Sequence, residues 1–425
     1  MLYLYKTISK LSKPALLALL SRRLAKGKED PSRIAERKGK SEIARPEGKL
    51  FWVHAASVGE AQSALVLIHG VLRQYPDAQC LVTTGTKTSA ALMRNKLPDR
   101  AIHQYYPLDH PKWAARFLDH WRPDICLWME SELWPNMLLA IQKRKIPAAL
   151  VNARLSPRSY RRWKRFQSSI ATLLDSFGLI LAQRQAEADY FIDLGAKNVL
   201  VSDNLKYSAK PLDCDEQDYN ALLKALSGRP VVTYASTHKG EEDLACQIHS
   251  TLKDRFPGLL SIIVPRHPDR GHEVSRICDE YHLDPVLRRL AKRVPDKDTD
   301  IYIVDTIGEL GLIYKMAPFA FIGRTFSDDG GGGHNPLEAA LLNCAVLHGP
   351  HYQNLSDIFE DMNSQNAAIQ IHQKKDLGPT IEGLLHDPER LAALQKNALD
   401  FAARKSRVID TVMDEIKPLL NDALR

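Results

Sequence analysis

A glycine-rich segment near residue 335 has the residue types that bind a phosphate. In GGGGHNPLEAA, residues 330–340, the glycines let the backbone approach a ligand without obstruction by Cβ atoms. Pro336 is typical of a first helical position, so we expect a helix to begin near Asn335 and its free N–H groups to bind an anion. Glu338, in the first turn, would accept hydrogen bonds from sugar hydroxyls. A flexible turn is the alternative, but the apolar run PFAFIG before the segment favours a nucleotide site.

A second segment, FWVHAASVGEAQ at residues 51–62, places one carboxylate at the end of an apolar run. Glu60 follows Gly59 at the expected start of a helix. An isolated glutamate in this position most often only offsets the helix dipole. Without further motifs, the sequence favours that structural role.

Other apolar runs also end in polar side chains. These are Ser236 and Thr237, Arg266 and His267, Glu309, and Glu130 with Glu132. The forked guanidinium of Arg266 suits a phosphate, whereas His267 alone is equally compatible with an ordinary loop histidine. Glu241 and Glu242 are more plausibly helix-start charges than ligands.

Short β-branched runs alternate with helical patterns along the whole chain, which predicts an α/β fold with parallel sheets. The polar, turn-rich segment 206–220 indicates a boundary between two Rossmann-like domains. We expect the carboxyl ends of both sheets to face a central cleft, because ligands bind there in open α/β sheets. The expected strands are 51–55, 80–84, 124–129, 147–151, 178–182, 231–234, 259–264, 301–304, 318–322 and 345–347.

Several enzyme classes lack their motifs in this chain. It has no GxGxxG after a strand, no GxxxxGK[ST], no GxSxG and no HExxH. Two short DxD patterns, at 213–215 and 296–300, precede strands and are interpreted as solvated acidic turns, so we expect neither a metal nor a cofactor. The 6 cysteines are widely spaced, which favours free thiols in a reducing compartment.

The positive charge of the chain is concentrated in residues 1–50, which hold 13 Lys and Arg against 5 Asp and Glu. Since the whole chain has a net charge of +7, the remainder is close to neutral and makes a poor nucleic-acid platform. Drawn as a helix, the N-terminal arm places Leu4, Ile8, Leu11, Ala15 and Ala18 on one face. The longest apolar stretch of the arm is too short to span a bilayer. The arm is therefore either an interfacial membrane helix or a helix docked on its own protein.

An ordered set of motifs resembles one known family. The motifs are ERKG, HAASVGE, MESELWPN, VNARLSPRS, LGAKNV, STHKGEE, VPRHP, DTIGELGLIY and GGHNPLEAA. The chain is similar over most of its length to the Kdo transferases of glycosyltransferase family 30. Members of that family add 3-deoxy-manno-octulosonate (Kdo) to the lipid A precursor of Gram-negative bacteria.

The resemblance implies a GT-B architecture: a membrane-anchoring arm at 1–44, an acceptor domain at 45–210 and a CMP-Kdo domain at 211–425, whose C-terminal helices pack back toward the acceptor domain. It further implies inverting, metal-independent transfer from CMP-Kdo to lipid IVA at the cytoplasmic face of the inner membrane, with the arm peripheral or anchored. By the same resemblance Glu60 is the general base, and Glu130 and Arg154 support the acceptor side or the transition state. The implied donor-binding residues are Arg266, His267, Glu309, Asn335, Glu338, Ser236, Thr237 and Lys206.

A glutamate with a pKa near 4.3 is ionised at neutral pH, and a helix N-terminus lowers the pKa further. A productive base at position 60 therefore also needs partial desolvation. One departure from the family is FIGRTFSDDGGGG, in which Arg324 and Phe326 replace the usual small residues and are expected to reshape the donor loop.

A second basic cluster, containing Arg158, Arg161, Arg162 and Arg165, suits the phosphates of a lipid acceptor, with a solvated helix face and an RNA-binding patch as alternatives. Two other functions remain open. One is a GT-B transferase that uses another nucleotide sugar on a different lipid. The other is a non-catalytic membrane adaptor that binds a nucleotide.

Overall fold

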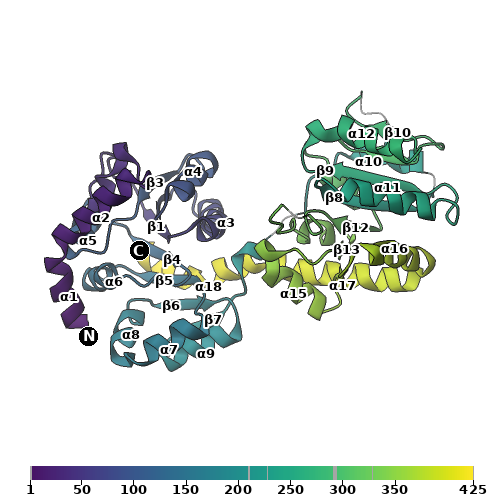
Figure 1. The fold of residues 1–425 in the computed structure, drawn as a ribbon. Coiled ribbons are helices and arrows are strands. Elements are labelled where there is room, and N and C mark those ends of the chain that lie inside the picture. The colour runs from purple at the N-terminus through teal and green to yellow at the C-terminus, as the bar shows by residue number, and fades with distance from the viewer. Residues whose placement is uncertain (1, 209–210, 227, 291–293, 328, 425) are drawn as a thin grey trace. The chain divides into compact units, whose positions relative to one another are not determined.

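The computed structural model describes residues 2–208, 211–226, 228–290, 294–327 and 329–424. The chain divides into two compact units, which are described separately (Figure 1). Unit 1 comprises Met1–Ser208 and Arg407–Arg425, and unit 2 comprises Ala209–Ser406. The predicted boundary at 210/211 falls beside residues 209–210, which lie outside the described residues.

Unit 1 contains a seven-stranded parallel sheet in the order β3-β2-β1-β4-β5-β6-β7. The central strand β1 is buried along its whole length, as expected for a parallel sheet covered on both faces. The strands are β1 (Leu50–Ala55), β2 (Gln79–Thr84), β3 (Ala101–Tyr105), β4 (Ile125–Met129), β5 (Ala148–Ala153), β6 (Leu179–Ala182) and β7 (Val199–Val201).

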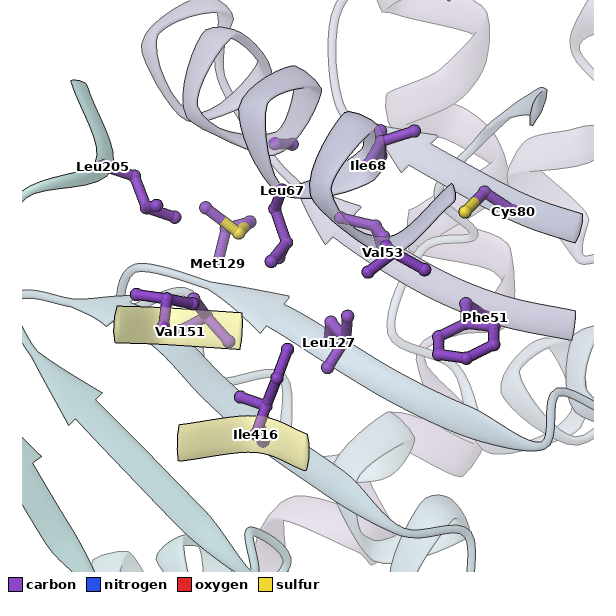
Figure 2. Packing of buried hydrophobic residues seen from close by; sticks show 14 of the residues in the cluster. Phe51, Val53, Leu67, Ile68, Cys80, Leu127, Met129, Val151, Leu205 and Ile416 are labelled. Carbon is purple, nitrogen blue, oxygen red and sulfur yellow. The ribbon is translucent and has the colours of Figure 1, made fainter. Parts of the chain in front are cut away.

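The helices of unit 1 come from both ends of the chain. They are α1 (Leu2–Leu11), α2 (Lys13–Ala25), α3 (Val58–Gln74), α4 (Lys87–Lys96), α5 (Pro111–Trp121), α6 (Pro135–Lys143), α7 (Pro157–Lys164), α8 (Gln167–Leu174), α9 (Gln185–Asp193) and α18 (Val408–Leu424). Helix α18 packs on the sheet of unit 1, where Ile416 joins Leu127 and Val151 in the hydrophobic core (Figure 2). The last segment of the chain is therefore part of the unit that contains the first.

Unit 2 contains a second seven-stranded parallel sheet, ordered β10-β11-β9-β8-β12-β13-β14. Its strands are β8 (Val231–Thr237), β9 (Leu260–Pro265), β10 (Pro285–Leu287), β11 (Ile301–Ile303), β12 (Phe319–Ile322), β13 (Ala345–His348) and β14 (Ile369–Gln370). Its helices are α10 (Glu216–Leu226), α11 (Glu241–Leu252), α12 (Gly271–Glu280), α13 (Leu310–Met316), α14 (Leu337–Ala340), α15 (Ser356–Ser364), α16 (Leu377–His386) and α17 (Pro388–Ser406).

Each sheet has a point where the chain reverses the direction in which it adds strands. In unit 1 this switch point lies between β1 and β4, and in unit 2 it lies between β8 and β12. Connections diverge there and leave a crevice at the carboxyl ends of the strands, where open α/β sheets bind ligands. Polar residues that follow β1, β4, β8 and β12 are therefore positioned for function.

The N-terminal arm forms two helices rather than the single amphipathic helix expected from its sequence. The break falls at Ser12, because Pro14 in the first turn of α2 cannot continue a preceding helix. Helix α1 is docked on unit 1 through Tyr5, whose hydroxyl donates to Asp109 at 2.9 Å, and through Ser9, which bonds Asn136. No helix in the described part of the chain is long and apolar enough to cross a membrane.

The opposite face of α1 is apolar and points to solvent. Leu4, Ile8 and Leu11 are 60%, 58% and 77% exposed. A soluble helix normally buries such residues, so this face is available to another apolar phase.

Candidate active site

Glu60 sits at the start of helix α3, directly after the central strand β1 of unit 1. Ser57 caps the helix, and its side chain accepts from the backbone N–H of Glu60 at 3.3 Å. The Glu60 carboxylate turns back, and its Oε2 accepts from the N–H of Ala56 at 2.8 Å. The Ser57 side chain also hydrogen-bonds the carboxylate and favours its charged form. The local structure thus holds the Glu60 carboxylate at the start of α3.

Burial, together with the negative charge of Glu130, raises the pKa of Glu60 to about 7. This outcome corrects the expectation of a low pKa set by the helix N-terminus. Desolvation outweighs the hydrogen bond from Ala56, because the residue is only 7% exposed. The carboxylate therefore titrates near neutral pH, where a general base is most effective.

Two residues near the carboxyl ends of strands in unit 1 have strained backbone, and one of them, Glu130, interacts with Glu60 through its charge. Glu130 follows β4 with a φ of 56°, and Asn152, in β5, has a φ of 57°. Left-handed conformations at non-glycine residues cost energy and are common at functional sites. Lys206 lies beside the same helix start, because a Cβ atom on Gly59 would come within 3.3 Å of its ammonium group. Arg154 follows β5 and is exposed.

Most of the polar residues predicted for the donor lie at the carboxyl ends of strands of unit 2. Lys206 is an exception, because it lies in unit 1 beside the start of α3, and Glu309 is held in a separate ionic network. Ser236 and Thr237 end β8, and the carbonyl of Thr237 accepts from the backbone N–H of Arg266, which follows β9. Burial raises the pKa of Glu338, and the positive charge of Arg266 offsets part of this rise. The two side chains are therefore close enough to interact through their charges. The sequence therefore brings these residues together at one switch point.

The glycine-rich loop differs from the expected phosphate cradle. Gly330, Gly331, Gly332 and Gly333 all have positive φ values, between 52° and 132°, so the conformation requires glycine. Three of its N–H groups are already used: Gly331 donates to Asp329, Gly332 to the carbonyl of His351 and Gly333 to the carbonyl of Arg324.

The helix that follows the glycine-rich loop is also smaller than predicted. Helix α14 has only four residues, and its N-cap is Pro336, so it contributes a small dipole. The Asn335 side chain accepts from Leu337 N–H at 3.1 Å and donates to Glu338 at 3.4 Å. Positive charge for an anion must therefore come from side chains such as Arg266.

A buried carboxylate that the sequence did not single out joins the two loops at this switch point. Oε2 of Glu241 accepts from the backbone N–H groups of His238 and Arg324 at 2.9 and 2.8 Å. Its Oε1 accepts from Thr325 and Phe326 at 3.2 and 3.0 Å. Glu241 is 2% exposed and thus acts as more than a helix-start charge.

The unusual sequence of the donor loop has a structural reason. Phe326 is buried and stacks on Phe321 of β12, with ring centroids 5.5 Å apart. Arg324 has a φ of 61°, and its guanidinium lies near Asp329. Gly323 is required because a Cβ atom there would lie 2.3 Å from the carbonyl oxygen of Ser236. The core therefore accommodates Phe326, and the loop accommodates Arg324.

A histidine cluster forms part of the same region. His238 and His334 approach within 3.1 Å through their Nε2 atoms, and His267 lies 6.0 Å from His238 between ring centroids. Burial, together with the nearby positive charges, lowers the pKa of His334 to about 4. A cavity of about 490 Å³ adjoins this cluster and is lined by His238, His267, Arg270 and Ser327, among others.

Glu309 is held in a separate ionic network. It caps α13 and accepts two hydrogen bonds from Arg288, at 2.7 and 2.6 Å, and the Arg288 side chain is fully buried. Arg288 also pairs with Asp218. The geometry gives Glu309 a role in ordering the segment after β11. Within the described residues, no group of three or more metal-ligating side chains is found.

The chain is similar to several known proteins. A family model described as 3-Deoxy-D-manno-octulosonic-acid transferase (kdotransferase) matches residues 32–209. A 3-deoxy-D-manno-octulosonic acid transferase of Rickettsia typhi is 35% identical, with 87% of this chain and 80% of the relative aligned. The corresponding protein of Rickettsia bellii is 32% identical, with 98% and 99% aligned. Among solved structures, UDP-GlcNAc 2-epimerase from Neisseria meningitidis, bound to UDP-GlcNAc, has a TM-score of 0.50 and aligns with 86% of this chain and 100% of its own. Its sequence is 12% identical, so the likeness is one of fold alone.

Two parallel α/β units with polar side chains at their switch points form a fold of GT-B type. The relatives named as transferases make the chain a glycosyltransferase. The extent and identity of the matches are sufficient to assign the family. The chain belongs to the 3-deoxy-D-manno-octulosonic acid transferases.

Proposed function

We propose that this enzyme transfers Kdo from CMP-Kdo to the lipid A precursor lipid IVA during lipopolysaccharide synthesis, with inversion at the anomeric carbon. The proposal is supported by relatives named as 3-deoxy-D-manno-octulosonic acid transferases. The single observation that carries the mechanism is the position of Glu60, a buried carboxylate with a pKa of about 7 at the switch point of unit 1.

In the proposed step, the carboxylate of Glu60 takes the proton from a sugar hydroxyl of the acceptor. The hydroxyl oxygen forms a bond to the anomeric carbon of Kdo, and the bond from that carbon to the phosphate oxygen of CMP breaks. CMP departs with the electron pair, and the configuration inverts because the hydroxyl attacks the face of the anomeric carbon opposite the departing phosphate. General-base catalysis of this kind contributes typically about 10²–10⁴-fold in rate.

Unit 2 holds the donor in this proposal. Arg266 neutralises the phosphate as its charge develops, and the buried carboxylate of Glu338 accepts from the ribose hydroxyls. Glu241 keeps the loops after β8 and β12 in the conformation that presents these groups. No metal is needed in this scheme, since a guanidinium meets the leaving-group charge.

The enzyme is proposed to act at the cytoplasmic face of the inner membrane of a Gram-negative bacterium. The exposed face of α1, formed by Leu4, Ile8 and Leu11, suits insertion into the apolar edge of a bilayer. The arginine hollow on α7 has a volume of about 490 Å³ and is lined by Arg158, Ser159, Arg161, Arg162 and Arg165, which suits anionic headgroups. Peripheral attachment fits this arm better than a spanning anchor.

Mass spectrometry of the products formed from CMP-Kdo and lipid IVA tests the proposed function. A lipid product heavier by one or more Kdo residues is the expected result, and an unmodified acceptor would contradict it. The shift in Tm caused by CMP, UDP or ADP distinguishes a CMP-linked donor from the donors of other GT-B transferases. We expect CMP to raise the Tm and UDP and ADP to leave it unchanged. A protein stabilised by CMP that never forms product would instead be the non-catalytic adaptor.

A further inference from the structure

Arg37 of the ERKG motif is a buried arginine of unit 1, in the short 3-10 helix Glu36–Lys38 between α2 and β1. It is 5% exposed, and its partner Glu29 is 2% exposed. The guanidinium donates to both carboxylate oxygens of Glu29, through Nε at 3.0 Å and Nη2 at 3.2 Å. Burial alone would raise the pKa of Glu29, but the hydrogen bonds and charges of Arg37 and Arg23 hold it below its ordinary value. The buried pair is therefore ionised.

The same guanidinium binds two turns at the carboxyl edge of the sheet. Its Nη2 donates at 2.8 Å to the carbonyl of Gly85, which directly follows β2. Its Nη1 donates at 2.7 Å to the carbonyl of Tyr106, which directly follows β3. An arginine side chain has five N–H groups, and these four hydrogen bonds use most of them. Arg37 is therefore placed to hold backbone rather than a ligand.

The burial of this ion pair has a cost that stability alone does not justify. A buried ion pair adds little net stability, because the loss of hydration offsets the attraction between the charges. An apolar pair could fill the same volume, but it could not bind two carbonyls from one rigid, planar group. The contribution of Arg37 is thus the fixed spacing of the turns after β2 and β3.

The turn after β2 is in direct contact with the turn that holds Glu60. The N–H of Gly85 donates to the carbonyl of Ala56 at 3.1 Å, and the N–H of Ala56 donates to Oε2 of Glu60 at 2.8 Å. A Cβ atom on Gly85 would lie 2.8 Å from the carbonyl oxygen of Ala56, so the two turns meet without room for a side chain. Three successive hydrogen bonds therefore connect Arg37 to the carboxylate of Glu60.

We propose that Arg37 is a positioning residue for the general base, because it holds the turn after β2 and that turn holds Ala56 against Glu60. The inference rests on the proposed function, since it concerns the presentation of the base in that reaction. A loosened turn would admit water to Glu60, and hydration moves the pKa of a buried carboxyl back toward its ordinary value. Since Arg23 of α2 also binds Glu29, at 2.6 Å, the N-terminal arm is tied to the same network.

Arg37→Lys tests this role in the full-length enzyme. A lysine keeps a positive charge beside Glu29 but has no planar fork that binds both carbonyls. We expect kcat to fall about tenfold, which corresponds to about 1.4 kcal/mol, and the pH midpoint of kcat/KM to move to lower pH. CMP affinity should stay unchanged, because the proposed donor site lies in unit 2.

Arg100→Lys is the matched control. Arg100 lies in unit 1 directly before β3, and it also binds backbone, through the carbonyls of Leu72, Tyr75, Pro76 and Ala78. These contacts lie beside the amino ends of the strands, away from the Glu60 turn. A merely structural arginine should lower the Tm when replaced and leave kcat and the pH midpoint unchanged, which is the expected result for Arg100→Lys.

Gly85→Ala disturbs the next link, because the added Cβ atom must displace the carbonyl of Ala56. It should reproduce the lower kcat and the lower pH midpoint. The double variant with Arg37→Lys should lose less activity than two independent losses would give, because both changes act on one series of hydrogen bonds.

Carbon-13 NMR of enzyme labelled at the glutamate side-chain carboxyl measures the ionisation of Glu60 without turnover, and Glu60→Gln assigns its signal. The wild type should titrate near pH 7, and Arg37→Lys at lower pH. Wild-type kcat and an unchanged titration in Arg37→Lys overturn the positioning role and leave the proposed function intact. Absence of Kdo transfer by the wild type refutes the proposed function instead. Should Arg37→Lys be unfolded at the assay temperature, Gly85→Ala decides, and wild-type kcat and titration in that variant also overturn the role.

Discussion

The backbone N–H of Ala56 donates to Oε2 of Glu60 at 2.8 Å across the turn that joins β1 to α3. This hydrogen bond holds the carboxylate against the carboxyl end of the central strand, where it is largely shielded from water. The carboxylate proposed as the general base is therefore also part of the turn before α3, and the two roles can be separated because they respond differently to pH and to substitution.

The pH dependence of kcat/KM should report the ionisation of Glu60. Because burial raises its pKa to about 7 and only the ionised form accepts a proton, activity should rise with pH and reach half its plateau near pH 7. Glu130→Gln removes a negative charge that favours the protonated form, so the midpoint should move to lower pH. Initial rates at fixed subsaturating acceptor measure both profiles, and a midpoint near pH 4.5 would contradict this environment for Glu60.

The same burial predicts a cost in stability. A carboxyl group whose folded-state pKa is raised stabilises the fold below its unfolded pKa and loses that contribution as pH rises through the folded value. From about 4.5 to about 7, the difference amounts to about 3 kcal/mol. Glu60→Gln should therefore raise the Tm relative to wild type at pH 8 and change it little at pH 4. Differential scanning calorimetry at both pH values measures this, and an equal effect at the two would refute it.

The four amide contacts of Glu241 predict a positioning role in donor binding. Glu241→Gln keeps one acceptor oxygen but turns an NH₂ group toward two backbone N–H groups, at a cost of about 1–3 kcal/mol. We expect CMP affinity to fall about tenfold and the donor KM to rise more than kcat falls. Glu382→Gln, in an ion pair of α16 with Arg255, is the control. Wild-type CMP affinity in Glu241→Gln would rule out the role.

The outward face of α1 predicts reversible membrane binding. Replacing Leu4, Ile8 and Leu11 together by Ser should abolish co-sedimentation with vesicles of anionic phospholipid without lowering the Tm, because these side chains are already exposed. The control variant replaces three exposed apolar residues outside the arm: Ile192, Leu200 and Leu223. Equal vesicle binding by the two triple variants would exclude the arm as the attachment site.

The α/β fold was predictable from the sequence because its central strands are continuous apolar runs. The strands that were missed are β3, β7, β10 and β14, and each lies at an edge of its sheet. Edge strands are buried less completely, as Leu200 and Val201 of β7 show with 39% and 45% exposure, so their sequences lack a strong apolar signal. Sheet order, and with it the two switch points, depends on long-range pairing that no local pattern encodes.

The candidate site was predictable only in part for a similar reason. Residues at the carboxyl ends of neighbouring strands, such as Ser236 near the end of β8 and Arg266 directly after β9, come together because parallel strands end at one edge. The role of Glu241 depends on amides 83 to 85 positions away, and its local sequence matches any acidic helix start. The raised pKa of Glu60 likewise follows from tertiary burial, which outweighs the local helix dipole.

The most direct test of Glu60 as the general base is the turnover of Glu60→Gln with CMP-Kdo and lipid IVA, compared with Ser57→Ala and Glu187→Gln. Ser57→Ala removes the cap of α3 and leaves the carboxylate, and Glu187 is a first-turn glutamate of another helix in unit 1. We predict that Glu60→Gln retains CMP binding and loses about 10²–10⁴-fold in kcat, while both controls keep most of their activity. Wild-type turnover in Glu60→Gln, or an equal loss in Ser57→Ala, would contradict the assignment of Glu60 as the base.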